Sequence, residues 1–327
     1  MEAAALKFLV LGGPLFYDLC LFNPRAFQSV TTLTVMRHRD DSRAMFVHDL
    51  VQCLMALPGL QSLYLLGVIF KISDEEIEES SLELHLFALV LHSIPSDAIG
   101  KLCHAIDPLH SYIGSLEINR CAISGDQIPL LNAAHLLLTE FPADADILAV
   151  LKHWHGALLT IKNCPSFTDD VLSSMSCPGE NGQWPCPFMT HFTVISCSGC
   201  SSSAIRRTVE TRRRGYMNAG ATTTSDPKFR VNEVLSSTVS GCDELWLDDV
   251  VWLDANVAVV EYDGWVAGFD NEESYLPIRG HVPASHRSYR SKMLGVDLSR
   301  RVLDELASGK TGITFERYME EFCGSVE

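Results

Sequence analysis

Hydrophobic residues recur along this chain with one spacing. An apolar residue is followed by two free positions, an apolar residue, one free position, an apolar residue, two free positions and a small polar or thiol residue. Residues 113–121 (IGSLEINRC) and 189–197 (MTHFTVISC) meet this template in full, and 156–164 (GALLTIKNC) meets it with glycine in first place. The central alternation of apolar and free positions predicts a short strand in each copy.

Further copies of the template lie elsewhere in the chain. Residues 30–38, 60–68 and the segment around Leu9 follow the same spacing, and weaker copies lie around Leu84, Leu136 and Val260. A degenerate copy lies near Val234. Most copies are about 20 to 33 residues apart, which is the period of leucine-rich repeats with some insertions.

Segments with a helical period lie between the predicted strands. Apolar residues share one helical face in 46–57, 98–106, 147–154 and 167–175. A strand, turn and helix of this length cannot bury its apolar face alone, so the copies must stack on one another. The predicted fold class is therefore α/β: a leucine-rich-repeat solenoid with irregular repeats, a curved parallel sheet inside and helices outside.

The repeat signal sets the expected domain boundaries. The solenoid should span residues 1–265 without an N-terminal cap, and residues 266–327 should form a partly irregular C-terminal extension with one or two short helices. Residues 176–187, which are rich in glycine and proline, are expected to form a loop, and 215–230 a second, polar loop.

Composition narrows the class of partner. The chain has 327 residues, is 47% hydrophobic and carries a net charge of −16. This charge disfavours nucleic acid and membrane surfaces as partners and favours a basic protein. Eleven cysteines in apolar-periodic segments of a long chain indicate buried, reduced thiols in the cytoplasm or nucleus. At the last template position a cysteine should fill the turn as a compact apolar side chain.

Groups that could carry chemistry have simpler explanations. Cys177, Cys186, Cys197 and Cys200 include only one closely spaced pair, so neither a metal nor a cofactor is expected. A metal-dependent enzyme that uses residues 153–200, including His153 and His155, is the alternative. The acidic pairs 169–170 and 248–249 suit helix starts. The arginines of 206–207 and 212–214 suit a helix C-terminus, with a nuclear-localisation patch as the alternative. We therefore expect no catalytic residue.

The free positions of each strand should face the concave side of the sheet, which is the candidate binding face. Ten strands at about 4.8 Å spacing would present an arc of roughly 45 Å, which suits a peptide or a protein surface. The predicted face residues are Thr34, Met36, Tyr64, Leu66, Glu117, Asn119, Thr160, Lys162, Thr193 and Ile195.

Two segments carry a resemblance to a known family. The cysteine-bearing repeats, with the turn NCPSFTDDVL at 163–172, resemble those of F-box/LRR proteins, which are substrate receptors of SCF-type ubiquitin ligases. Residues 245–265 (LWLDDVVWLDANVAVVEYDGW) are similar to the last repeats of F-box-like proteins of mushroom-forming fungi, with Trp252, Val257 and the turn 261–263 in matching places.

The resemblance implies a non-enzymatic protein–protein recognition module that binds the substrate of a ubiquitin ligase. The family's F-box, an N-terminal helical module that holds a Skp-type adaptor, has no counterpart in this chain, which begins almost directly inside a repeat strand. Such an adaptor is therefore expected only if an F-box lies upstream. A scaffold of leucine-rich repeats without a role in ubiquitination is the alternative.

Overall fold

The computed structural model describes the repeat region and not the C-terminal extension. Described are residues 6–12, 15–18, 27–37, 44–71, 82–106, 111–121, 123, 133–179, 181–221, 230–242 and 246–263. All of them belong to one compact unit, Met1–Arg279. The predicted extension, residues 266–327, lies outside the described residues.

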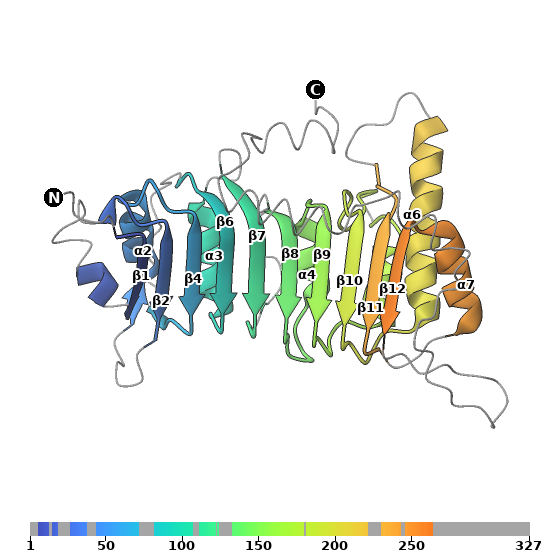
Figure 1. Ribbon diagram of the computed structural model, residues 1–327, viewed down its shortest axis with the longest axis horizontal. Coiled ribbons are helices and arrows are strands. Elements are labelled where there is room, and N and C mark those ends of the chain that lie inside the picture. The colour runs from blue at the N-terminus through green and yellow to red at the C-terminus, as the bar shows by residue number, and fades with distance from the viewer. Residues whose placement is uncertain are drawn as a thin grey trace. The chain divides into compact units, whose positions relative to one another are not determined.

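Ten strands of the described chain form one sheet and lie side by side in chain order (Figure 1). All neighbouring pairs are parallel. The strands are β1 (Phe8–Gly12), β2 (Thr32–Met36), β4 (Ser62–Leu66), β6 (His85–His92), β7 (Tyr112–Asn119), β8 (Ala133–Thr139), β9 (Leu158–Lys162), β10 (His191–Ile195), β11 (Ser236–Ser240) and β12 (Val259–Asp263). The prediction of an α/β fold with a parallel sheet is confirmed.

Helices form most of the crossovers that parallel neighbours require. They are α2 (Val47–Met55), α3 (Ser96–Ala105), α4 (Ile147–His153), α5 (Asp169–Met175), α6 (Ser202–Ala221) and α7 (Leu247–Asn256). Figure 1 shows α2, α3 and α4 behind the sheet, and α6 and α7 beside its last strands. Two short strands, β3 (Met45–Phe46) and β5 (Phe70–Lys71), pair separately in parallel.

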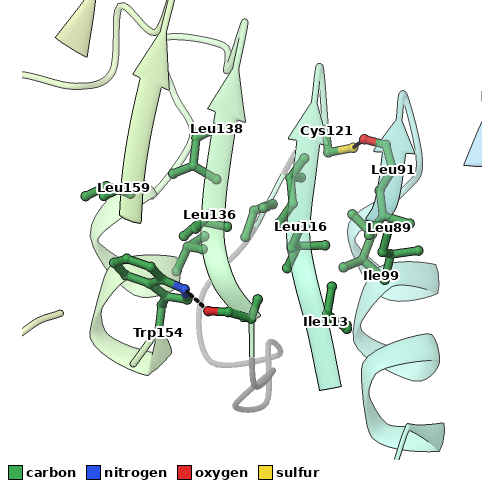
Figure 2. Close-up of a cluster of buried hydrophobic side chains, with 14 of the residues drawn as sticks. Leu89, Leu91, Ile99, Ile113, Leu116, Cys121, Leu136, Leu138, Trp154 and Leu159 are labelled. Carbon is green, nitrogen blue, oxygen red and sulfur yellow. Dashed lines mark hydrogen bonds between the residues drawn. The ribbon is translucent and has the colours of Figure 1, made fainter. Parts of the chain in front are cut away.

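The core lies between the sheet and these helices. Figure 2 shows side chains of successive strands lined up in lateral rows, with Leu89, Leu116, Leu136 and Leu159 in one row. Each of these four is at most 3% exposed. Full burial of one such side chain contributes about 1.5–3 kcal/mol, so the repeated apolar positions supply the main drive for stacking.

Each of the seven strands of the ten-stranded sheet from β4 to β11 is followed by a residue with a left-handed backbone. These residues are Gly67, Ser93, Arg120, Glu140, Asn163, Ser196 and Gly241, with φ between 52° and 64°. The backbone N–H of each of the first six donates to the carbonyl of the last residue in the next strand, over 2.7 to 3.0 Å. One turn geometry therefore extends the parallel ladder by one bond beyond each strand and sends the chain back towards the core.

The residue after this turn is the last position of the template. The three template cysteines there, Cys121, Cys164 and Cys197, are fully buried. Their thiols donate to carbonyls of the preceding strand, as Cys121 does to Leu91 over 3.5 Å (Figure 2). The prediction that these cysteines fill the turn is confirmed. Burial raises the pKa of the Cys197 thiol to about 12, so it stays protonated.

Two of the weaker template copies are displaced from their predicted places. The copy expected around Leu84 is centred on Leu89, because residues 86–94 meet the template with Ile94 in the thiol place. Residues 86–91 form a continuous apolar run, which fits more than one register of the template. The copy expected near Val234 centres on Ser237, where a serine takes the place of an apolar residue.

The predicted polar loop at 215–230 was wrong for its first part, because α6 continues to Ala221. The sequence there is poor in helix formers. The helix passes so close to its neighbours that a Cβ on Gly215 would lie 2.8 Å from Val231 and 2.9 Å from Trp184. A tertiary contact that needs glycine therefore outweighs local propensity. Residues 176–187 contain no helix or strand where they are described, as predicted.

The left-handed turn gives the first testable prediction. We expect Gly241→Ala to lower the free energy of unfolding by about 1 kcal/mol, because L-residues are disfavoured at positive φ. The added Cβ would also lie 3.0 Å from the Ser196 hydroxyl. Denaturant unfolding measures the change. Gly179→Ala is the control, since its Cβ would make only contacts of 3.5 Å or more. Equal effects of the two substitutions would contradict the assignment.

Candidate binding face

The sheet has one face that no helix of the described chain covers (Figure 1). We call it the open face. Its outward residues form three lateral rows that run across the strands. The first row is Phe8, Thr32, Ser62, Ala88, Ser115, His135, Leu158, His191, Ser236 and Val259. The middle row is Val10, Thr34, Tyr64, Val90, Glu117, Leu137, Thr160, Thr193, Thr238 and Glu261. The strand-end row is Gly12, Met36, Leu66, His92, Asn119, Thr139, Lys162, Ile195 and Ser240.

The ten predicted face residues all lie on the open face, and none is fully buried. Thr34, Tyr64, Glu117, Thr160 and Thr193 belong to the middle row. Met36, Leu66, Asn119, Lys162 and Ile195 belong to the strand-end row. The prediction that they bind a partner stays a prediction.

Sequence reasoning missed the contribution of β6 and β8. Val90 and His92 were missed because the copy around Leu84 was misplaced. His135 and Thr139 belong to the weaker copy around Leu136, whose face residues are not among the ten predicted. The signal was nevertheless there, since residues 133–138 have the full apolar spacing.

The side chains of the open face change from mainly apolar to mainly polar along the sheet. Its N-terminal part is apolar: Phe8 is 70% exposed, Val10 61% and Met36 39%. From β7 onwards, polar side chains dominate. We call one group of them, on β7, β8 and β9, the polar cluster. It consists of Ser115, Glu117, Asn119, His135, Thr139, Thr160 and Lys162.

His135 links the three strands of the polar cluster. Its Nε2 lies 3.0 Å from the Thr160 hydroxyl and its Nδ1 lies 3.4 Å from the Ser115 hydroxyl. Burial lowers the pKa of His135 below its ordinary value, which favours the neutral ring at pH 7. A neutral ring has one donor and one acceptor nitrogen, so it can bridge two hydroxyls that rotate to suit.

Asn119 and Thr139 are lateral neighbours and leave hydrogen-bonding capacity unused. The Asn119 amide nitrogen donates to the Glu117 carboxylate over 3.3 Å, which turns the amide oxygen away from Glu117. That oxygen and the Thr139 hydroxyl are shielded from solvent and have no hydrogen-bond partner in the described part of the chain. Thr139 is only 7% exposed although it lies on the open face. Such unpaired groups cost about 1–3 kcal/mol each.

Three of the four cysteines considered for zinc, Cys186, Cys197 and Cys200, fill the core instead. Cys186 donates to the Leu151 carbonyl over 3.3 Å, and Cys200 to the Phe167 carbonyl over 3.2 Å. Of the nine cysteines in the described ranges, eight are buried and only Cys177 is exposed. Within those ranges, no group of three histidine, cysteine or acidic side chains lies close enough to hold a metal ion.

The acidic pairs lie at helix starts, as predicted, and their carboxylates join neighbouring repeats. Asp169 begins α5 and accepts from both the backbone and the hydroxyl of Ser201, over 2.8 and 2.7 Å. Asp249, near the start of α7, accepts from Ser202 and Ser203 over 2.8 and 2.7 Å. A cavity of about 290 Å³ lies beside Asp169, but both oxygens of that carboxylate are already engaged.

The arginines predicted to follow a helix lie within α6. Arg212 is fully buried, and its guanidinium donates to the carbonyls of Met175, Pro185, Cys186 and Pro187. Burial lowers its pKa to about 10, so it stays cationic at pH 7. Arg212 therefore fixes the loop 176–187 onto the helix and is not accessible as part of a basic surface patch.

Comparison with models of known protein families and with curated protein sequences finds no match to this chain. The helices in its described part are all too short or too polar to span a membrane.

The unpaired hydroxyl of Thr139 gives a prediction on stability. Thr139→Val keeps the shape and removes an unsatisfied polar group, so we expect the free energy of unfolding to rise by about 1 kcal/mol. Ser237→Ala is the matched variant, because Ser237 is also buried with an unpaired hydroxyl but belongs to the core row. We expect it to stabilise the protein as well. Loss of stability in Thr139→Val, measured by denaturant unfolding, would show that the hydroxyl is already satisfied.

Two partly buried histidines predict a pH dependence. Burial lowers the pKa of His135 and His191. A depressed folded-state pKa means that stability is fully present above the ordinary value of 6.5 and is lost as the pH falls below it. We expect the melting temperature to fall between about pH 7.5 and about pH 5.5. His135→Gln, which cannot titrate, should make this fall smaller; an unchanged pH dependence would exclude His135 as a contributor.

Proposed function

We propose that this chain is a non-enzymatic protein-recognition module, with the architecture of a leucine-rich-repeat solenoid, that binds its partner on the open face. One observation carries the proposal: ten parallel strands in chain order present three continuous rows of outward side chains. Ten strands at about 4.8 Å spacing span roughly 45 Å, which suits a protein surface better than a small molecule.

The composition of the open face supports protein recognition. Stable protein interfaces combine an apolar, partly aromatic centre with polar groups around it. Exposed Phe8, Val10 and Met36 supply the first, and the polar cluster supplies the second. The net charge of −16 favours a basic partner.

The resemblance to F-box/LRR proteins extends the proposal to a cellular role. In this role the chain is the substrate-binding part of an SCF-type ubiquitin-ligase receptor, and the Skp-type adaptor is held by an F-box outside the repeats. Binding alone is its contribution, because the transferase is held elsewhere. A scaffold of the same architecture without a ubiquitin role would use the open face in the same way.

The open face can be tested with a matched pair of tyrosines. Tyr64 lies in the middle row, and Tyr216 is 50% exposed on α6. The tagged full-length protein is used to recover partners from the cells that produce it. We expect Tyr64→Ala to weaken capture of a reproducible partner at least tenfold, because interface aromatic residues carry much of the binding energy. Tyr216→Ala should leave capture unchanged.

The possible results of this experiment distinguish the receptor role, the scaffold role and binding elsewhere on the protein. Capture of both a partner and a Skp-type adaptor supports the receptor role. A partner without adaptor supports the scaffold. If Tyr216→Ala reduces capture and Tyr64→Ala does not, the partner binds the helical side and the open-face proposal fails; recovery of no reproducible partner would end both proposals.

A further inference from the structure

We propose that the polar cluster is a binding site for a guanidinium group, the side chain of an arginine of the protein partner. The inference rests on the proposed function, since it names what the partner must carry. Its basis is the set of hydrogen-bond acceptors that the protein leaves unused on the open face at β7 and β8.

The first step concerns the chemistry of the unpaired atoms. Only the amide nitrogen of Asn119 can donate to the Glu117 carboxylate, so the orientation of the amide is set and the unused atom is the oxygen, an acceptor. The Thr139 hydroxyl in the next strand can accept as well. Together with the carboxylate of Glu117, the site offers three kinds of acceptor and one formal negative charge.

The second step concerns how these acceptors are placed. Asn119 and Thr139 are direct partners in the ladder between β7 and β8, so their side chains lie about 4.8 Å apart across the strands. Glu117 lies two residues before Asn119 on the same face of β7. A ligand that satisfies all three needs several donors in one plane. Guanidinium has five N–H donors in a rigid fork, whereas ammonium is a compact point charge.

The third step concerns what holds the site in shape. His135 is bonded to Thr160 and Ser115, which ties β8 to both neighbouring strands. The Arg120 and Glu140 side chains form an ion pair at the ends of β7 and β8. The acceptors are therefore presented by rigid strands, which limits the entropy lost on binding.

Lys162 is the one cation of the polar cluster and lies beside Thr139 in the strand-end row. It is exposed and long, so it can move away as the partner's side chain reaches the shielded acceptors. Lys162 also distinguishes an arginine ligand from an acidic ligand. An arginine ligand is repelled by Lys162, whereas an acidic ligand would depend on it.

The test uses the full chain and small probes. N-acetyl-arginine amide is titrated while the side-chain amide signals of Asn119 are followed by NMR. N-acetyl-citrulline amide is the neutral analogue, and N-acetyl-aspartate amide is the acidic probe. We expect saturable shifts with the arginine probe only, because hydrogen bonds to a charged donor are stronger than neutral ones.

Variants separate binding from folding. Thr139→Val and Glu117→Gln should each weaken binding of the arginine probe about tenfold. Ser237→Ala should leave binding unchanged, and Lys162→Ala should strengthen it, because the substitution removes a cation that repels the probe. Glu117→Asp, which keeps the charge on a shorter chain, should bind better than Glu117→Gln. The melting temperature of each variant reports whether it has folded.

Three results would overturn the guanidinium site. One is equal binding of the citrulline probe, and another is binding of the aspartate probe that Lys162→Ala abolishes. The third is a cellular partner that is lost with Tyr64→Ala but retained by Thr139→Val and Glu117→Gln. This last result would leave recognition by the open face intact, so failure of the site and failure of the proposed function are distinguishable.

Discussion

The parallel hydrogen-bond ladder is the constraint on which the rest of the structure depends. A strand can join the sheet only if it ends level with its neighbour and the chain then leaves towards the helices. The left-handed residue after each of the seven sheet strands from β4 to β11 meets both needs, and in the first six of these turns its N–H bonds the neighbouring strand's last carbonyl. Because the next side chain then enters the core, it must be apolar or a thiol. Backbone geometry therefore determines which residue types recur at the end of each repeat.

The same constraint makes the open face. Once alternate residues of each strand are committed to the core, the others are placed in rows, whatever their chemistry. At β7, β8 and β9 these rows bring together a carboxylate, an amide, an imidazole and hydroxyls that lie far apart in sequence. Two of these groups are shielded and unpaired, which lowers stability without serving the fold. Unpaired polar groups on the open face are typical of a functional site, whereas the unpaired Ser237 hydroxyl lies in the core row.

The sequence predicted much of the fold because the apolar spacing is dictated by burial. Copies centred on Leu116, Leu159 and Phe192 were placed correctly, since each has apolar residues at the two central core positions and a thiol in the turn. The copy at Leu89 was misplaced because a continuous apolar run fits more than one register. The strand around Ser237 carries a polar residue in a core position, and the end of α6 depends on close approach to Trp184. Neither of these two features can be recognised from the local pattern of apolar and polar residues.

The polar cluster was beyond sequence reasoning for a different reason. Glu117, Asn119 and Lys162 were predicted to lie on the face, but their neighbours depend on lateral register across repeats of unequal length. That Asn119 bonds Glu117 and leaves its oxygen free is a matter of side-chain geometry, which spacing does not contain.

The left-handed turns have a consequence for how such a protein can diverge. Five of the seven turns carry an ordinary side chain there: Ser93, Arg120, Glu140, Asn163 and Ser196. In this turn the backbone N–H forms the hydrogen bond to the next strand, so the side chain contributes little to folding. Single mutations at these left-handed positions, which line one rim of the sheet, can therefore introduce new charges while the hydrogen-bond ladder stays intact. Related chains could acquire different partners along this rim without rebuilding their cores.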